Sequence, residues 1–173
     1  AFDQFEICDA CRVKEEKLKI DWKQRELELR DICEKYRSKD GSYDVIVPSS
    51  GGKDSCYVAY ELKYVYGMHP LCVTYAPAMF TDIGWRNLKN FCENFDTLIY
   101  YPNRKIHSKL TRIAMEYFGD PFQPWHYGQQ SYPLRVAINY KIPLVFYGEN
   151  QDVEYGGDQS NANRGDETLK KRE

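Results

Sequence analysis

The chain has 173 residues, a formal net charge of −2 and 42% hydrophobic residues. This length suits one globular domain and excludes a large multidomain enzyme, while the apolar fraction excludes wholesale disorder. The charge provides no overall positive field, so we expect no nucleic-acid partner, and no apolar run approaches the ~20 residues of a membrane span.

The first predicted features are a cysteine pair and a charged helix. Cys8 and Cys11 have the C-x-x-C spacing of one half of a tetrahedral zinc site, which predicts a tight metal-binding knuckle. A redox pair and two buried thiols are the alternatives. Asp21 and Gln24 resemble a capping box and predict a helix over 21–37. The remaining cysteines are too sparse for a disulfide scaffold, so we expect a reducing, cytoplasmic setting.

Strands and helices then alternate along the chain. Short apolar runs predict strands at 43–47, 71–74, 97–100 and 144–147. Apolar residues at helical spacing predict helices at 54–66, 82–95, 106–117 and 131–140. This alternation is typical of an α/β fold with an open, mostly parallel sheet and helices on both faces, in which ligands bind at the carboxyl ends of the strands.

We therefore expect three segments. Residues 1–40 hold the cysteine pair and the charged helix, and residues 41–157 form the α/β domain. Residues 158–173 are almost devoid of apolar side chains, which predicts a polar lid, a linker or a disordered tail. The chain begins with Ala1 rather than Met, and we expect it to be part of a longer protein.

The segment after the first predicted strand has the composition of a phosphate-binding loop. It reads Ser49, Ser50, Gly51, Gly52, Lys53, Asp54 and Ser55. Its glycines leave backbone N–H groups open to an anion, and the N-terminus of the following helix favours negative charge. Lys53 would bind phosphate oxygens, Asp54 would hold Mg²⁺ or a lysine, and Ser50 and Ser55 would donate hydroxyl hydrogen bonds. The segment matches neither the Walker A pattern nor the dinucleotide fingerprint.

Residues 50–55 instead resemble the PP-loop of the ATP pyrophosphatase (N-type) superfamily, whose members cleave ATP between the α and β phosphates. Within it the chain is most similar to the N-acetyl sugar amidotransferases, which make acetamidino sugars for bacterial surface polysaccharides such as O-antigens and for flagellar glycans. The segments that carry this likeness are 8–11, 20–22, 43–55, 148–150 and 154–157. Family members carry a further C-x-x-C before the one seen here and continue beyond residue 173.

The resemblance implies that the β and γ phosphates of ATP lie on residues 50–55. It places the adenine beside the strand end at Val73 and Tyr75 and adds Gly148 to the nucleotide site. An N-acetyl sugar would be adenylylated and then attacked by ammonia. Because no glutaminase signature is visible, the ammonia would come from a partner glutaminase with a cyclase-like channel subunit.

The same resemblance implies Lys53 and Asp54 as catalytic residues, and zinc at Cys8 and Cys11 in the complete protein. Glu149 directly follows a predicted strand end, where α/β enzymes place their chemistry, which favours a substrate-binding or acid/base role. A solvated loop charge is the alternative for Glu149.

Two other functions remain open at this point. A PP-loop tRNA thiolation enzyme also combines this loop with cysteine pairs, and a non-catalytic nucleotide-binding subunit could keep the loop without turnover. An aromatic segment at 124–129, which includes His126, is expected either to line a sugar or nucleotide pocket or to be core. His69 and His107 are expected on the surface.

Overall fold

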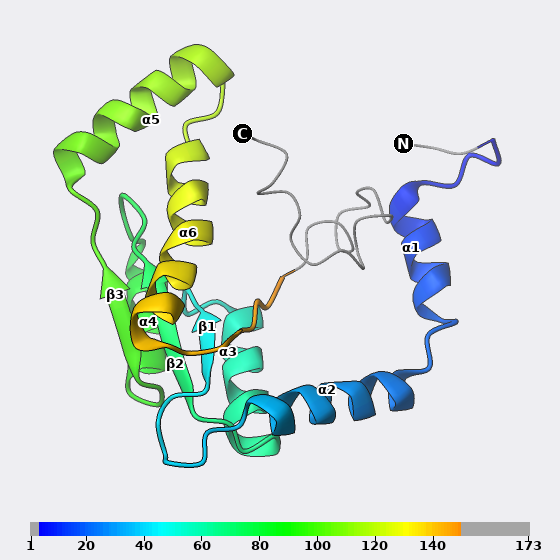
Figure 1. Cartoon of the computed structure of the whole chain (residues 1–173). Helices are drawn as coiled ribbons and strands as arrows, with labels where there is room; N and C mark the ends of the chain where they lie inside the picture. Colours follow the sequence, from blue (N-terminus) through cyan, green and yellow to red (C-terminus); the bar gives the residue numbers. More distant parts are fainter. Residues whose placement is uncertain (1–3, 150–173) are drawn as a thin grey trace. The chain divides into compact units, whose positions relative to one another are not determined.

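The computed structural model describes residues 4–149 (Figure 1). Contacts between Cα atoms divide the chain into two units, Leu29–Gly148 on the one hand and Ala1–Glu28 with Glu149–Glu173 on the other. The predictions made for 154–157 and for the tail at 158–173 lie outside the described residues.

The unit Leu29–Gly148 is built on a four-stranded sheet in which every neighbouring pair is parallel. Its strands are β1 (Val45–Pro48), β2 (Pro70–Tyr75), β3 (Thr97–Tyr100) and β4 (Leu144–Val145), in the order β3-β2-β1-β4. In the register, Val45 pairs with Pro70 on one side and with Leu144 on the other. The predicted parallel α/β fold is therefore confirmed.

Helices connect the strands and precede them. In chain order they are α1 (Asp9–Lys17), α2 (Trp22–Tyr36), α3 (Lys53–Tyr60), the π-helical turn η1 (Glu61–Val65), α4 (Asp82–Cys92), α5 (Arg104–Phe118) and α6 (Gln123–Tyr140). Helix α2 crosses the boundary between the two units. The backbone N–H groups of Lys23 and Gln24 both lie 3.1 Å from the Asp21 carboxylate, so the predicted cap of this helix is confirmed.

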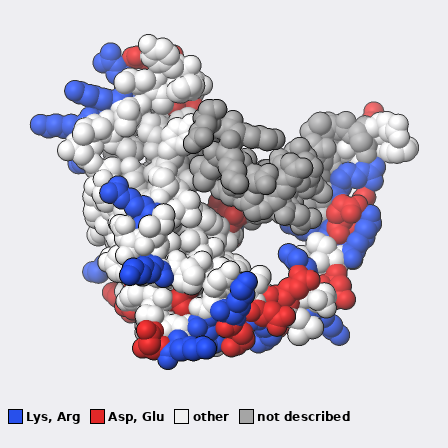
Figure 2. Space-filling model, in the orientation of Figure 1, with Lys and Arg blue, Asp and Glu red and all other residues white. Residues whose placement is uncertain are grey.

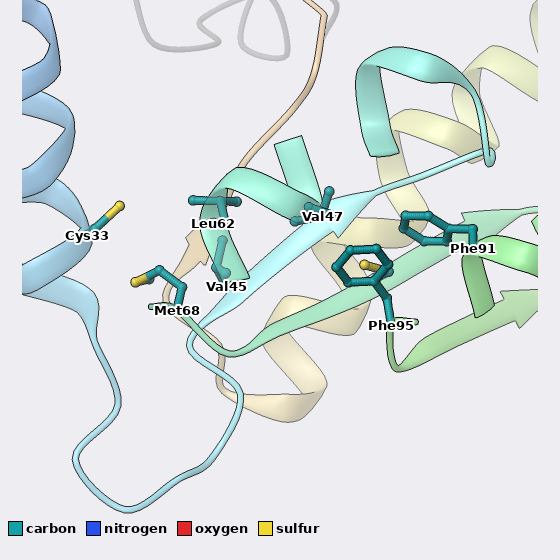
Figure 3. Packing of buried hydrophobic residues seen from close by; sticks show 9 residues of the cluster. Cys33, Val45, Val47, Leu62, Met68, Phe91 and Phe95 are labelled. Atoms are coloured by element: carbon teal, nitrogen blue, oxygen red, sulfur yellow. The ribbon is translucent and has the colours of Figure 1, made fainter. Parts of the chain in front are cut away.

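The two faces of the sheet bury different residues because successive strand side chains point to opposite sides. On one face, Val45 and Val47 pack in a cluster that α2, α3, η1 and α4 cover. Figure 3 shows this cluster, to which Cys33, Leu62, Met68, Phe91 and Phe95 contribute. On the other face, Ile46, Leu71 and Val73 pack against Val136 and Ala137 of α6. Each large side chain buried here contributes about 1.5–3 kcal/mol.

Helix α1 was not predicted, and several elements have other bounds than the sequence predicted. Helix α6 begins at Gln123 rather than at 131, and the aromatic segment forms its first turns. Pro124 in the first turn is compatible with a helix because its missing N–H has no intrahelical partner there. Strand β4 ends at Val145, although the Phe146 N–H still donates to the Ile46 carbonyl oxygen at 2.8 Å.

Candidate functional site

The strand order creates a switch point beside β1. The chain moves from β1 outward to β2 and β3, then returns to place β4 on the opposite side of β1. The loops that follow β1 and β4 therefore leave neighbouring strands at the same, carboxyl edge of the sheet. Ligands of open α/β sheets bind in the crevice at such a point.

Gly148 shows how closely these two loops approach. A Cβ atom at this residue would lie 3.3 Å from the carbonyl carbon of Asp54 and 3.4 Å from the backbone nitrogen of Ser55. The segment after β4 thus lies directly against the first turn of α3. The structure brings together Asp54, Ser55 and Gly148, which the sequence predicted for one site from positions far apart in the chain.

The base of the loop is fixed to β2. The Ser49 N–H donates to the Val73 carbonyl oxygen at 2.9 Å, and the Thr74 hydroxyl donates to the Ser49 carbonyl oxygen at 2.8 Å. Ser49 and Thr74 are both buried, so water competes little for these bonds. Val73, predicted to lie near the adenine, is therefore a direct neighbour of the loop.

Gly51 sets the path of the loop. Its φ of +76° lies in the left-handed region, which an L side chain adopts only with strain. A Cβ atom here would also lie 2.7 Å from the Cα atom of Leu88 in α4. Both facts require glycine at this position. The close approach shows that the loop packs directly on the backbone of α4.

Hydrogen bonds within the loop order its remaining residues. The Ser50 hydroxyl lies 3.3 Å from the Gly52 nitrogen, and the Ser55 hydroxyl lies 3.2 Å from the Gly52 carbonyl oxygen. Helix α3 begins at Lys53, and its N-cap residue Gly52 offers no side chain to the first amide groups. Amide groups of a first helical turn lack intrahelical acceptors and carry the positive end of the helix dipole. This turn is suited to bind phosphate.

Lys53 and Asp54 form an ion pair at the start of α3. The ammonium nitrogen of Lys53 lies 2.6 and 2.7 Å from the two carboxylate oxygens of Asp54. Their side chains are 87% and 45% exposed, so the pair contributes little to stability. A phosphate oxygen can replace the carboxylate as the partner of Lys53, which releases Asp54 to bind a Mg²⁺ ion. The residues present therefore fit a magnesium nucleotide.

Tyr75 ends β2 within a packed aromatic cluster. Its ring centroid lies 5.4 Å from that of Tyr100 and 6.2 Å from that of Tyr132. The ring lies so close to α6 that a Cβ atom at Gly128 would be 2.3 Å from it, and burial raises the pKa of Tyr75. The indole N–H of Trp125 is 3.4 Å from the Tyr75 carbonyl oxygen. The first turns of α6 thus reach the carboxyl edge of β2.

His107 corrects a sequence prediction. It was expected on the surface, but it is 7% exposed, and its ring centroid lies 6.3 Å from that of Tyr75. The Thr111 hydroxyl donates to the His107 carbonyl oxygen at 2.9 Å, and Ala114 on the same side of α5 is also buried. Within residues 4–149 its Nε2 atom has no hydrogen-bond partner. The sequence did not indicate the burial of His107. The large apolar residues of α5 lie on the neighbouring side of the helix, so the sequence pattern predicted that side to be buried. His126 is exposed, and His69 is 49% exposed as expected.

Glu149 is exposed and directly follows Gly148. It is the first residue of the segment Glu149–Glu173, which belongs to the other unit. A substrate-binding or acid/base role for Glu149 stays a prediction.

Cys8 and Cys11 lie at the start of helix α1, where the sequence predicted a tight knuckle. Cys8 is the N-cap residue, and Cys11 is exposed in the first turn. Hydrogen bonds from the backbone and the thiol of Cys11 lower the pKa of Cys8, and the same thiol contact raises the pKa of Cys11. No group of three or more potential metal ligands occurs among residues 4–149. Zinc binding by Cys8 and Cys11 stays a prediction.

The cysteines are expected to react with iodoacetamide in a fixed order. Thiolates are the reactive form, so Cys8, with its lowered pKa, should be alkylated first. Cys72 is buried, and burial raises its pKa to about 12, so it should react only after unfolding in urea. Peptide mass spectrometry over a time course measures this order. Labelling of Cys72 as fast as Cys8 in the folded protein would contradict the described packing.

No protein-family model and no curated protein matches the chain. Its function is therefore inferred from the loop between β1 and α3 and from the residues around it. In the part of the chain that the structure describes, no helix is long and apolar enough to cross a membrane.

Proposed function

We propose that the chain is an ATP-dependent amidotransferase that converts the N-acetyl group of a sugar to an acetamidino group and releases AMP and pyrophosphate. The observation that carries this proposal is the loop at residues 50–55, which joins β1 to α3 at the switch point and has Gly148 against its helical end. The resemblance of this loop to the PP-loop supports cleavage between the α and β phosphates. The wider resemblance to N-acetyl sugar amidotransferases supports the acceptor class, a nonulosonic acid or a nucleotide-linked sugar of bacterial surface glycans.

The loop would act mainly on the pyrophosphate end of ATP. Backbone N–H groups at the start of α3 and the ammonium group of Lys53 would stabilise the charge that develops on the leaving pyrophosphate. A bound Mg²⁺ ion, held by Asp54, would neutralise the phosphate charge. Fixed donors of this kind need no reorganisation during the reaction.

The proposed reaction has two displacements. In the first, the acetamido oxygen attacks the α phosphorus, and the bond from that phosphorus to the departing pyrophosphate breaks. In the second, ammonia attacks the resulting imidate carbon, loses a proton and expels AMP, which keeps the original acetamido oxygen. Glu149 is the candidate to accept that proton. An amide oxygen is a poor leaving group, so its conversion to a phosphate ester is what makes the second step possible.

The ammonia would come from a glutaminase partner with a cyclase-like channel subunit. No cysteine of this chain stands in a glutaminase-like nucleophile context. Free ammonium at elevated pH can replace such a partner in an assay, because only the neutral amine is nucleophilic.

Product analysis tests the proposal. The protein is incubated with ATP, Mg²⁺, ammonium and a panel of N-acetyl sugars, and bulk tRNA with a sulfur donor is run in parallel. We expect AMP and pyrophosphate only in the presence of a sugar, and a sugar product lighter by the difference between oxygen and an NH group. AMP formation that depends on tRNA would instead establish a thiolation enzyme, ADP would overturn the assignment of the loop, and nucleotide binding without turnover on any sugar would indicate a non-catalytic subunit.

A further inference from the structure

Helix α5 has an exposed apolar stripe. Ile106, Leu110, Ile113 and Tyr117 are between 46% and 79% exposed, whereas His107 and Ala114, on the adjacent side of the helix, are buried. Within its unit, α5 packs mainly on α6. In Figure 1, α5 and the first half of α6 extend past the carboxyl ends of the strands. None of the stripe residues belongs to the loop at residues 50–55.

The spacing of the stripe is that of a helix-pairing seam. Its residues follow one another at intervals of four, three and four positions, which places them in one row along the helix. Tyr117 and Phe118 near the end of α5 are 79% and 73% exposed. One aromatic side chain can bury ~150–250 Å², and a contiguous apolar patch of this kind marks an interaction site.

We propose that this stripe binds the same stripe of a second copy of the chain, with the two α5 helices antiparallel. The interval pattern is unchanged when the sequence direction is reversed. An antiparallel copy therefore places Leu110 opposite Ile113 of the second copy and Ile106 opposite Tyr117 of the second copy, so every stripe residue meets an apolar partner. A two-fold axis between Leu110 and Ile113 generates both halves of the interface.

The charges beside the stripe select the second copy and the antiparallel direction. Lys109 and Glu116 immediately precede the stripe residues Leu110 and Tyr117, so they lie seven positions apart on the same flank of α5. In an antiparallel pair, this flank faces the same flank of the other helix. Lys109 then lies beside Glu116 of the second copy, and the axis repeats this opposite-charge pair. In a parallel pair, Lys109 would instead lie beside Ala114 of the second copy, which carries no charge to pair with it. The charges therefore favour the antiparallel direction.

Two further basic residues lie on α5, Lys105 and Arg112, farther round the helix from the stripe than Lys109 and Glu116. The Glu116 carboxylate pairs with Arg112 within its own helix at 2.8 Å, so Lys109 of the second copy would share it with Arg112. Figure 2 shows Lys and Arg atoms projecting from the edge of the molecule over α5, with mostly white surface beside them. The tail at 158–173 has Ala162 and Leu169 as its apolar side chains, too few to complement four large stripe residues. A second copy supplies a complementary surface of equal length.

Sedimentation equilibrium of the full chain over a range of protein concentrations tests the proposal. We expect a reversible dimer. One pair of short helices makes a small interface, so the dissociation constant should lie in the micromolar range. Lys109→Glu would place a negative charge beside Glu116 of the second copy, and the two-fold axis would repeat this repulsion, so the dissociation constant should rise at least tenfold. Glu116→Lys should have the same effect, because it would place two positive charges together. The double variant Lys109→Glu with Glu116→Lys restores opposite charges and should recover most of the affinity.

Lys105→Glu is the matched control, because it makes the same charge change on α5 away from the proposed seam. It should leave the dissociation constant within about twofold of the parent value, since exposed charges distant from a seam interact weakly. Leu110→Gln should abolish the dimer while far-ultraviolet circular dichroism remains unchanged. A parent chain that stays monomeric throughout, equal weakening by Lys105→Glu and Lys109→Glu, or no recovery in the double variant would each overturn the proposal. None of these readouts depends on ATP turnover, so this inference is tested separately from the proposed function.

Discussion

Replacement of Gly51 by alanine is expected to lower the free energy of unfolding by about 2–4 kcal/mol and to abolish ATP binding. About 1–2 kcal/mol comes from the left-handed backbone conformation of this residue. A similar amount comes from overpacking, because the new methyl group would lie 2.7 Å from the Leu88 Cα atom, which belongs to a helix backbone and cannot rotate away. The loop must then move off α4, which displaces the amide groups expected to hold phosphate. Urea unfolding measures the first effect, and titration with a fluorescent ATP analogue measures the second.

Gly41 supplies the matched control. Its φ is +81°, close to that of Gly51, but no atom lies within 4 Å of the position of an added Cβ. Gly41→Ala should therefore cost only the conformational part, about 1–2 kcal/mol, and should leave ATP binding intact. The difference between the two variants isolates the contact between the loop and α4. Equal losses of stability in both variants would show that the loop does not press on Leu88.

Local patterns were sufficient to predict the sheet and its loop. Val45, Ile46 and Val47 are β-branched and apolar, and Pro48 and Ser49 follow them, so a strand can be predicted here from a few residues, although β1 spans Val45–Pro48 rather than 43–47. The strand at 97–100 was predicted with the bounds that β3 has. Regular alternation of such runs with helical spacing constrains the sheet to be parallel, because each connection contains a helix.

Features that depend on contacts between distant segments could not be predicted. Nothing near Gly51 in the sequence indicates that it contacts the backbone of α4. Likewise, nothing near Gly148 indicates that it packs against the peptide bond between Asp54 and Ser55. The burial of His107 depends on the ring of Tyr75, which arrives from β2. Helix α1 was also not predicted: the C-x-x-C spacing indicated a tight knuckle, whereas good helix formers such as Ala10, Lys14 and Glu15 continue the chain as a helix.

Replacement of Lys53 by alanine is expected to reduce AMP formation by a factor on the order of 10²–10³, as the loss of one preorganised charge-stabilising donor does in other active sites. The Lys53 side chain is 87% exposed and its ion pair with Asp54 is a surface contact, so the fold should persist. The measurement is the rate of AMP release with a responsive N-acetyl sugar, together with the urea midpoint of the variant.

Two further variants separate charge from position at this residue. Lys53→Arg keeps the positive charge but changes the shape of the donor, so it should keep more activity than Lys53→Ala while remaining below the parent. Lys105→Ala removes an equally basic side chain from α5 and should leave AMP formation unchanged. Because in the proposed reaction the pyrophosphate would develop its charge beside the loop, the activity lost in Lys53→Ala should appear mainly in kcat rather than in KM. Full activity in Lys53→Ala, with an unchanged urea midpoint, would show that the phosphates are held elsewhere and that the start of α3 is not the site of the reaction.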